Sequence, residues 1–321
     1  MRILVIGAGA VGGYFGGRLL EAGRDLTFLV RPGRAAQLAR TGMDIRSGTG
    51  DVHLSSPPLI LAPEVREPFD VVLLSCKSYD LEGAIDALAP AVGPRTAVIP
   101  LLNGMRHLGI LDERLGPGPV LGGRCFISAR VDDAGRILHL SDSHEISFGK
   151  RSAEQGPLVD AAVAALGGVG FDARATDQIL LEMWEKWVFL ATLAGTTCLM
   201  RASIGDIVTA DGSDLAASLL EECRSIAADA GYPPRPESLE RAQGLLTAPG
   251  SAMTASMLGD VERGSRTEAD HVLGDLLRRR SVPARGSLLR VAYTALKAHE
   301  ARLSREVLPK RAETPSVVPQ R

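Results

Sequence analysis

The residues best suited to chemistry lie at the start of the chain, where glycines have the spacing that binds a pyrophosphate. They follow the apolar run Ile3–Ile6, which has the character of a buried strand. In this pattern Gly7 permits a tight turn, Gly9 lets the backbone approach a phosphate, and Gly12 allows close packing of helix on strand. The N-terminus of the following helix then offers its free amides to the phosphates. The alternative is a glycine-rich turn that binds no ligand, but such a turn would not need to lie between a strand and a helix. The residues predicted to hold the cofactor are Gly7, Ala8, Gly9, Ala10, Val11 and Gly12.

The end of the second apolar strand, Leu26–Val30, indicates which dinucleotide is bound. NAD-specific sites usually place an acidic residue there, which accepts from the ribose 2′-hydroxyl. This chain has Arg31 and then Arg34, and guanidinium groups match the oxygens of a 2′-phosphate. Lys77, after a later strand, adds a third positive charge to the same predicted pocket. The alternative is a solvated basic loop, but the pattern favours NADP(H) as the cofactor.

The elements that position these residues alternate short apolar strands with amphipathic stretches over residues 1–172. This pattern is typical of βαβ units and predicts an α/β fold, a Rossmann-like doubly wound sheet. Two segments of alternating polarity, Met43–Leu54 and Cys125–Phe148, predict antiparallel hairpins appended to that sheet. The predicted strands are Ile3–Ile6, Leu26–Val30, Val71–Ser75 and Thr96–Ile99.

Helical periodicity replaces the strands after about Ala175 and predicts an all-α C-terminal domain over residues 173–304. Its apolar segments Leu215–Cys223 and Val272–Leu277 favour a homodimer formed through this domain. Residues 305–321, with three prolines, are expected to form a disordered tail. The predicted helices are Ile179–Met200, Asp214–Ala230, Pro236–Leu246, Glu268–Arg280 and Leu288–Arg302.

Charge and composition exclude several classes of partner. The net charge of -2 provides no field for binding nucleic acid, and the first apolar run is too short for a signal or a membrane span, so we expect a cytoplasmic protein. The four cysteines lie far apart and are expected to be reduced thiols. His139 and His144 fall in a predicted hairpin without a third ligand, so no metal site is assigned.

Several stretches together resemble the ketopantoate reductase (2-dehydropantoate 2-reductase) family over nearly the whole chain. Members of that family have a Rossmann domain followed by a helical domain, and they reduce a 2-oxo acid with NADPH between the two. The stretches that carry the resemblance are Met1–Gly12, Cys76–Lys77, Leu101–Met105, Glu185–Lys186, Ser256–Asp260 and Thr267–Glu268.

The resemblance implies roles for four residues outside the glycine-rich turn. Lys186 would bond the substrate carbonyl and donate the proton as hydride arrives, although by itself the sequence favours a surface lysine paired with Glu182. Asn103 would contact the nicotinamide end of the cofactor or the substrate, or it is simply a turn residue. Glu268 would contact the substrate or a ribose, and Ser256 would bind the substrate carboxylate; the alternatives are a helix N-terminal charge and a capping hydroxyl.

Departures from the family pattern concentrate on the substrate side. The family commonly has asparagine where this chain has Leu190, Ala194 and Met253, and its arginine three residues before the glutamate is displaced, giving Ser265 followed by Arg266. A pocket that exchanges amides for apolar side chains bonds a substrate hydroxyl less well.

The favoured hypothesis is therefore an NADPH-dependent reductase of a 2-oxo acid, with ketopantoate as the default substrate. One alternative is a related dehydrogenase that oxidises a hydroxy acid or an opine-like compound. The other is an NADP(H)-binding regulator without turnover, which the loss of the asparagines at positions 190 and 194 motivates.

Overall fold

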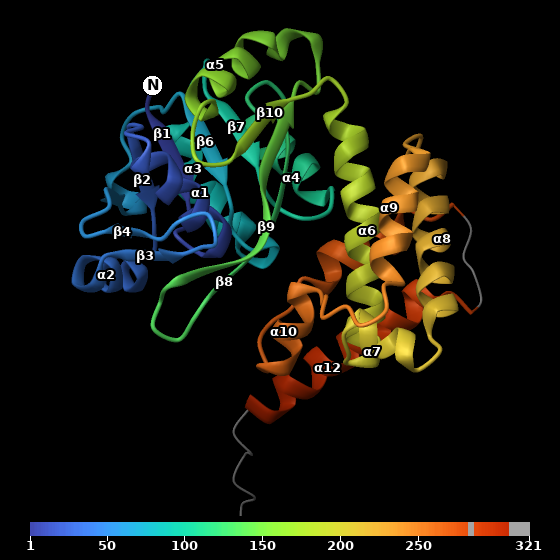
Figure 1. Ribbon diagram of the computed structural model, residues 1–321. Coiled ribbons are helices and arrows are strands. Elements are labelled where there is room, and N and C mark those ends of the chain that lie inside the picture. The colour runs from blue at the N-terminus through green and yellow to red at the C-terminus, as the bar shows by residue number, and fades with distance from the viewer. Residues whose placement is uncertain (282–285, 308–321) are drawn as a thin grey trace, which may run out of the picture.

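The computed structural model describes residues 1–281 and 286–307 and shows an N-terminal domain beside a helical one (Figure 1). Helix α12, Leu288–Val307, extends into the segment expected to be a tail. The rest of that predicted tail, residues 308–321, lies outside the described residues.

The N-terminal domain is built on a five-stranded parallel sheet in the order β5-β2-β1-β6-β7. All residues of β1, β6 and β7 are buried, because helices cover both faces of the sheet. The Rossmann-like fold predicted from the alternating pattern is thereby confirmed. The strands are β1 (Ile3–Ile6), β2 (Leu26–Leu29), β5 (Leu59–Ile60), β6 (Val71–Leu74) and β7 (Ala97–Pro100), and the helices are α1 (Ala10–Glu21), α2 (Pro32–Thr41), α3 (Leu81–Leu88), α4 (Arg106–Leu115) and α5 (Gly156–Leu166).

The two predicted antiparallel hairpins form, but they build a second sheet instead of extending the parallel one, so only their predicted position was wrong. In this sheet β3 pairs antiparallel with β4 and parallel with β9, while β9 also pairs with β8 and β10. Helix α1 lies between the two sheets, since a Cβ at Gly13 would meet Ile137 of one and a Cβ at Gly16 would meet Phe28 of the other. The strands are β3 (Met43–Arg46), β4 (Val52–Leu54), β8 (Gly122–Val131), β9 (Ile137–Gly149) and β10 (Asp172–Ala175).

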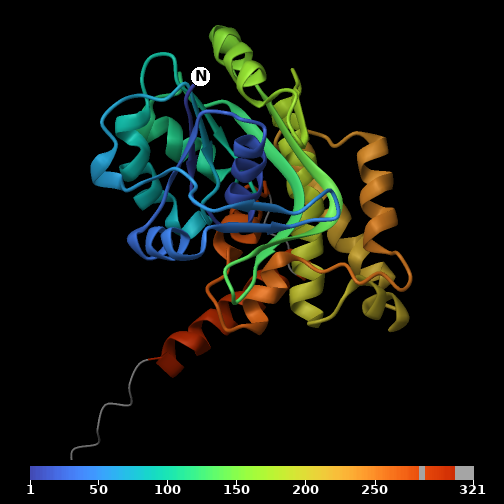
Figure 2. The same cartoon turned by 60° about the vertical axis from the view of Figure 1, so that its left-hand side comes forward.

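The C-terminal domain packs around α6, which is buried along most of its 22 residues. Its bounds match the prediction, and β10 crosses the expected domain boundary at residue 172 before α6 begins (Figure 2). None of the helices within the described part of the chain is long and apolar enough to cross a membrane. The helices are α6 (Ile179–Met200), α7 (Ile204–Thr209), α8 (Ser213–Asp229), α9 (Pro236–Leu246), α10 (Ser256–Glu262), α11 (Asp275–Arg278) and α12.

Two expectations about this domain change in the structure. The helix predicted over Glu268–Arg280 forms, but its first turn, Asp270–Gly274, is π-helical and continues directly into α11. The apolar segments taken to favour a dimer are packed inside the domain, because Leu219, Leu273 and Leu276 are buried there. The homodimer remains a prediction, and these apolar segments no longer support it.

Candidate active site

The predicted cofactor residues gather at the carboxyl edge of the parallel sheet. The chain passes from β1 to β2 on one side and later returns to β6 and β7 on the other, so the strand order reverses beside β1. Ligands of doubly wound sheets bind at such a switch point. The loops that follow β1, β2, β6 and β7 carry Gly7, Arg31, Lys77 and Asn103.

The glycine-rich turn has the geometry that a dinucleotide requires. Gly7 has φ +91°, and a Cβ on Gly12 would lie 2.1 Å from Ser75 Oγ and 2.2 Å from the Gly7 carbonyl oxygen, so helix and strand touch closely. A Cβ on Gly9 would meet no atom within 4 Å, which leaves open space in front of the backbone. Helix α1 begins at Ala10 without a side-chain cap, so its first amides are free for an anion.

The two arginines after β2 border this turn in different ways. Arg34 Nε donates to the carbonyl oxygen of Ala8 at 3.0 Å, and Arg34 Nη2 is buried without a partner. Arg31 is largely exposed, and its Nη2 lies 2.7 Å from Asp80 Oδ1. The turn, the unpartnered Arg34 nitrogen and the exposed Arg31 fit a phosphorylated dinucleotide, while Asp80 introduces a carboxylate that the sequence gave no reason to expect there.

Lys77 bridges the two domains. Its Nζ lies 3.2 Å from Asp260 Oδ2 and 3.3 Å from Glu268 Oε2. The backbone N–H of Ser78 donates to the other Glu268 oxygen at 2.8 Å. Although burial opposes its charge, the carboxylates of Glu268 and Asp260 raise the pKa of Lys77. The structure thus brings two predicted site residues, Lys77 and Glu268, into direct contact.

Lys186 is buried in the middle of α6 and points toward the N-terminal domain. Its side chain is 9% exposed, and Nζ lies 5.9 Å from the centre of the Phe126 ring on β8. Burial is the main cause that lowers the pKa of Lys186. Within residues 1–281 and 286–307, no carboxylate forms an ion pair with it.

The two acidic residues that precede that lysine in α6 pair with arginines. Glu182, the partner expected for a surface lysine, bonds Arg124 at 3.0 Å and Arg174 at 2.7 Å. Glu185 accepts from the backbone N–H and the guanidinium of Arg235, the latter at 2.6 Å. The surface-pair alternative for Lys186 is therefore wrong, because its neighbouring carboxylates are already occupied.

The remaining predicted site residues lie at the start of α10 and in the loop before α4. Ser256 opens α10 with an exposed side chain, and the cap of that helix is Ala255, so the serine is not a capping residue. Asn103 is half-buried in the loop before α4. The next residue, Gly104, lies against His271 of the helical domain, since a Cβ on Gly104 would lie 3.1 Å from the His271 carbonyl oxygen.

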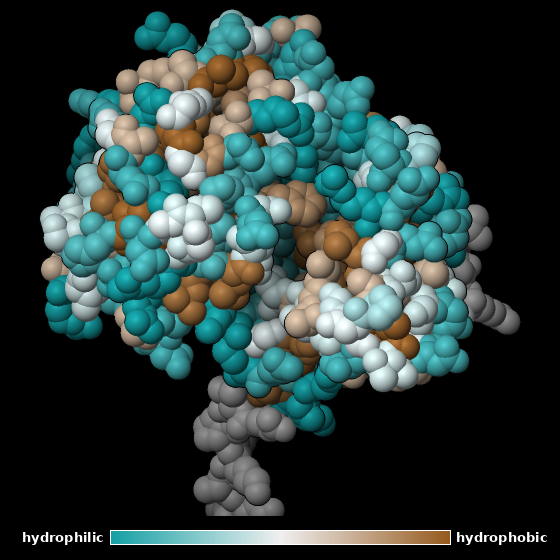
Figure 3. All heavy atoms as spheres, in the orientation of Figure 1, coloured by the Kyte–Doolittle hydropathy of each residue, from teal (hydrophilic) through white to brown (hydrophobic). Residues whose placement is uncertain are grey.

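Apolar side chains occupy the positions where asparagines were expected. Leu190 and Ala194 follow Lys186 by one and two turns of α6, and both pack in an apolar cluster that includes residues of both domains, as does Met253. Figure 3 shows a hollow between the two domains with hydrophobic residues on part of its wall. Phe126 is half-buried and belongs to neither apolar cluster of the interior, which fits a side chain at the edge of this hollow.

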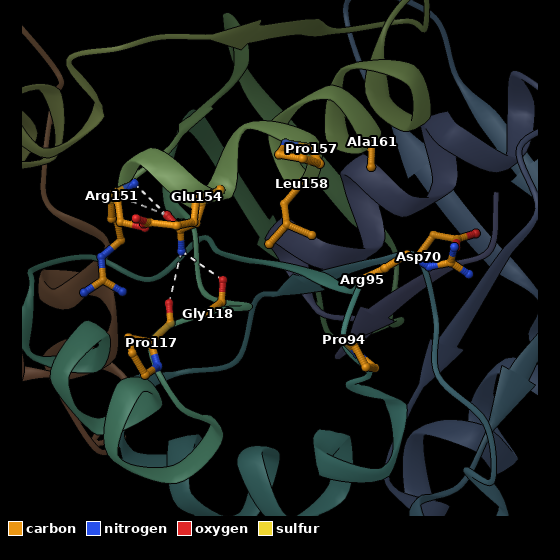
Figure 4. A pocket seen from close by; sticks show the side chains of 12 residues that line it. Asp70, Pro94, Arg95, Pro117, Gly118, Arg151, Glu154, Pro157, Leu158 and Ala161 are labelled. Carbon is orange, nitrogen blue, oxygen red and sulfur yellow. Dashed lines mark hydrogen bonds between the residues drawn. The ribbon is translucent and has the colours of Figure 1, made fainter.

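A separate pocket lies at the opposite edge of the sheet. It encloses about 860 Å³ and is lined by residues such as Asp70 and Arg95, which precede β6 and β7 (Figure 4). The amide of Gln155 is committed to the carbonyls of Pro117 and Gly118 at its wall. None of the predicted site residues lines this pocket.

The sequence gave no signal for Phe126 or Asp80, since a single aromatic or acidic residue in a strand or turn is common. The cysteines are free thiols, as expected. His139 and His144 bond Ser47 and Tyr14 respectively, and no cluster of three or more metal-ligating side chains is found among the described residues.

Comparison with known proteins places this arrangement in one family. The family model described as Ketopantoate reductase PanE/ApbA matches residues 3–153, and its C-terminal counterpart matches residues 178–298. The uncharacterized oxidoreductase YkpB of Bacillus subtilis is 37% identical over 303 residues, covering 94% of this chain and 99% of that protein. A 2-dehydropantoate 2-reductase of Mesorhizobium japonicum is 28% identical over 294 residues, covering 84% of this chain and 88% of that one.

A solved structure has the same overall fold. D-mandelate dehydrogenase in a ternary structure with NADH and anilino(oxo)acetate aligns with a TM-score of 0.85 at 20% identity, covering 95% of this chain and 100% of that chain. At this identity the likeness shows the fold alone. The two family models, which together span both domains, show that the chain belongs to the ketopantoate reductase family of oxidoreductases.

Proposed function

We propose that this protein reduces a 2-oxo acid to a 2-hydroxy acid with NADPH and that Lys186 donates the proton. The observation that carries the proposal is the buried ammonium of Lys186, which lies at the domain boundary without a carboxylate partner in the described residues. An unpaired buried cation is costly, and such groups cluster at functional sites. The nearby Glu182 and Glu185, by contrast, are each neutralised by an arginine.

Reduction of a carbonyl group requires an acid that donates a proton to the carbonyl oxygen. NADPH, when bound, supplies the hydride to the carbonyl carbon, and negative charge then develops on the carbonyl oxygen. Lys186 stabilises that charge and transfers a proton from Nζ to the oxygen, after which the neutral amine takes up a proton from solvent. The lowered pKa of Lys186 makes its ammonium a stronger acid than an exposed lysine.

Three polar residues from the two domains are proposed to bind the substrate. Ser256 has an exposed hydroxyl, which suits the substrate carboxylate. Asn103 lies in the loop after β7 and is proposed to orient the nicotinamide end of the cofactor or the substrate. One oxygen of Glu268 accepts from Lys77 and the other from Ser78, and each oxygen keeps a further lone pair. These lone pairs are proposed to accept a hydrogen bond from the substrate.

The cofactor is proposed to be NADPH, held by Gly7–Gly12 with Arg31 at the 2′-phosphate. Arg31 is exposed and one oxygen of Asp80 engages it, so the 2′-phosphate must compete with that carboxylate. The test is a fluorescence titration with NADPH and with NADH. Arg31→Ala should weaken NADPH binding by about 1.5–3 kcal/mol, or roughly 10- to 100-fold, and leave NADH binding unchanged. Equal affinities of the parent protein for the two cofactors would count against this choice.

The substrate is proposed to be ketopantoate or a more apolar 2-oxo acid. Leu190, Ala194 and Met253 provide no hydrogen bond to a substrate hydroxyl, and an unpaired hydroxyl is costly to bury. NADPH oxidation should be followed with ketopantoate and with 2-oxo acids that carry apolar side chains of increasing size. A complete lack of turnover across this panel would refute the reductase proposal.

A matched pair of lysine variants tests the proton donor. Lys186→Ala should lower kcat by about 10²- to 10⁴-fold while NADPH still binds, because only the acid is lost. Lys150→Ala is the control, since Lys150 is about half exposed and pairs with the exposed Asp177. If Lys186→Ala were as active as Lys150→Ala, Lys186 would not be the acid.

A further inference from the structure

Three segments of the N-terminal domain meet at the side chain of Arg34. Its Nε donates to the Ala8 carbonyl in the glycine-rich turn at 3.0 Å, and its Nη1 donates to Gln37 Oε1 on the same helix, α2, at 2.8 Å. Nη1 also lies 3.5 Å from the carbonyl oxygen of Gly135, at the tip of the hairpin that joins β8 to β9 (Figure 1). Arg34 therefore connects the turn after β1, helix α2 and a hairpin that lies 101 residues away in the chain.

The hairpin tip, residues 132–136, lies directly against α2. A Cβ on Gly135 would be 1.9 Å from Gln37 Nε2, so the two segments approach more closely than any other residue at this position would allow. Gly135 also has φ +83°, a conformation that favours glycine. Within the tip, the Asp132 carboxylate accepts from the backbone N–H and from the Nε of Arg136, both at 2.8 Å. The tip therefore has a defined shape and a close fit on α2.

The bond from Arg34 orients the peptide that joins Ala8 to Gly9. The C=O and N–H of a trans peptide point in opposite directions, so a carbonyl that is held by Arg34 directs the Gly9 N–H to the other side. The space beside Gly9 is open, because a Cβ there would meet no atom within 4 Å. Backbone amides of such a turn are the groups that bind a pyrophosphate. Arg34 thus sets the direction of an amide in the predicted pyrophosphate site.

Arg34 also carries a positive charge that has no ion-pair partner among the described residues. Its side chain is half-buried, Nη2 is buried without a partner, and burial lowers the pKa of the guanidinium. A partly desolvated cation of this kind is costly, and phosphates bound at the turn would lower that cost. Because Nη2 has almost no exposed surface, Arg34 is unsuited to direct contact with a 2′-phosphate, whereas the exposed Arg31 is suited to it.

We propose that Arg34 is a positioning residue for the pyrophosphate of the cofactor and that the β8–β9 hairpin tip belongs to the cofactor site through its contact with Arg34. Arg34 holds the glycine-rich turn in its binding conformation, and the tip holds Arg34. The contribution is equal for NADPH and NADH, because both contain the pyrophosphate, while Arg31 serves the 2′-phosphate of NADPH alone. This inference rests on the proposed function in one respect, since it requires a dinucleotide at this turn.

A comparison of arginine variants by fluorescence titration with NADPH and with NADH tests the role of Arg34. Arg34→Met keeps the length of the side chain and removes the guanidinium, so both dinucleotides should bind about tenfold more weakly with the ratio of their Kd values unchanged. Arg34→Lys keeps the charge and a donor and should restore part of this loss. Arg31→Ala should change the ratio instead. Arg40→Met, on the exposed face of α2, is the control and should bind both dinucleotides as the parent does.

A variant in the hairpin tip tests the second part of the proposal. Gly135→Ala places a methyl group against Gln37 at a position with positive φ, so it displaces the tip and the amide that holds Arg34. Both dinucleotides should bind several-fold more weakly, by the same factor. Because the tip acts through Arg34, adding Gly135→Ala to Arg34→Met should cause little further loss. Gly48→Ala, in the turn between β3 and β4 with no atom near its Cβ, is the matched control and should bind as the parent does.

Thermal unfolding of each variant without cofactor separates folding from binding, and the titrations are made well below each Tm. Unchanged binding of both dinucleotides by Arg34→Met, or a loss confined to NADPH, would overturn the positioning role of Arg34. Fully additive losses in the double variant would overturn the role of the hairpin tip. The reductase proposal fails separately, on the absence of turnover with 2-oxo acids, and that result does not alter this comparison of affinities. A parent protein that bound neither dinucleotide would overturn both.

Discussion

Adding one methyl group at Gly9 or at Gly12 separates cofactor binding from folding at the glycine-rich turn. A Cβ at Gly9 enters open space, with no atom within 4 Å. A Cβ at Gly12 would overlap Ser75 Oγ at 2.1 Å and the Gly7 carbonyl oxygen at 2.2 Å. The serine hydroxyl can rotate away, but the carbonyl belongs to the backbone of the turn and can move only with it.

The expected energies differ accordingly. Overpacking of this kind typically costs about 1–3 kcal/mol, and a backbone obstacle places Gly12→Ala near the upper end, or roughly 6–12 °C in Tm for a domain of this size. Gly9 has φ -87°, which alanine adopts freely. The lost flexibility of the unfolded chain offsets the poorer helix cap, so Gly9→Ala should stay within about 0.5 kcal/mol of the parent.

The effects of the two variants on NADPH binding should be in the opposite order to their effects on stability. The methyl group of Gly9→Ala occupies the space where a pyrophosphate approaches the backbone, and the loss of one charge-assisted hydrogen bond costs about 1.5–3 kcal/mol, or roughly 10- to 100-fold in Kd. Thermal unfolding by circular dichroism measures the first effect, and a fluorescence titration with NADPH measures the second. Gly244→Ala, on the exposed face of α9 with no atom near its Cβ, is the control and should leave NADPH binding unchanged.

Two results would refute this reasoning. Undiminished NADPH binding by Gly9→Ala would show that the nucleotide does not approach that backbone. Parent-like stability of Gly12→Ala would show that helix and strand are not in the close contact described here.

Three other changes have definite expected outcomes. Reduction should slow as pH rises through the lowered pKa of Lys186, because the acid is then deprotonated, and Lys186→Arg should move this alkaline limb upward in a kcat–pH profile. Glu185→Gln should lower the free energy of unfolding, measured in urea, by about 2–3 kcal/mol. This loss is smaller than for a fully buried ion pair, because Arg235 is partly exposed. A loss under about 0.5 kcal/mol would contradict this. Asp80→Asn should strengthen NADPH binding several-fold relative to NADH, since the carboxylate that competes with the 2′-phosphate for Arg31 is removed, and a weaker affinity would contradict the placement of the phosphate there.

The local chemistry of the sequence was enough to predict the Rossmann-like half of the molecule. Buried parallel strands are continuously apolar, and the glycines after β1 are required by contacts a few residues away, so both leave a signal in a short window. The bounds of β1, α6 and α9 were predicted to the residue. The second sheet was not predicted, because β3 pairs with β9 across some ninety residues and a short strand does not encode its partner.

The candidate site also has features that the sequence predicted and features that only the structure shows. The sequence by itself determined that Gly7–Gly12 forms a nucleotide-type turn followed by basic residues, and the resemblance to a family singled out Lys186. Only the tertiary structure decided that Lys186 has no ion-pair partner among the described residues, that Lys77 meets Glu268, and that His107 meets His271. The physical reason is that burial and electrostatic partnership depend on which segments fold together, and those segments lie more than a hundred residues apart in the chain.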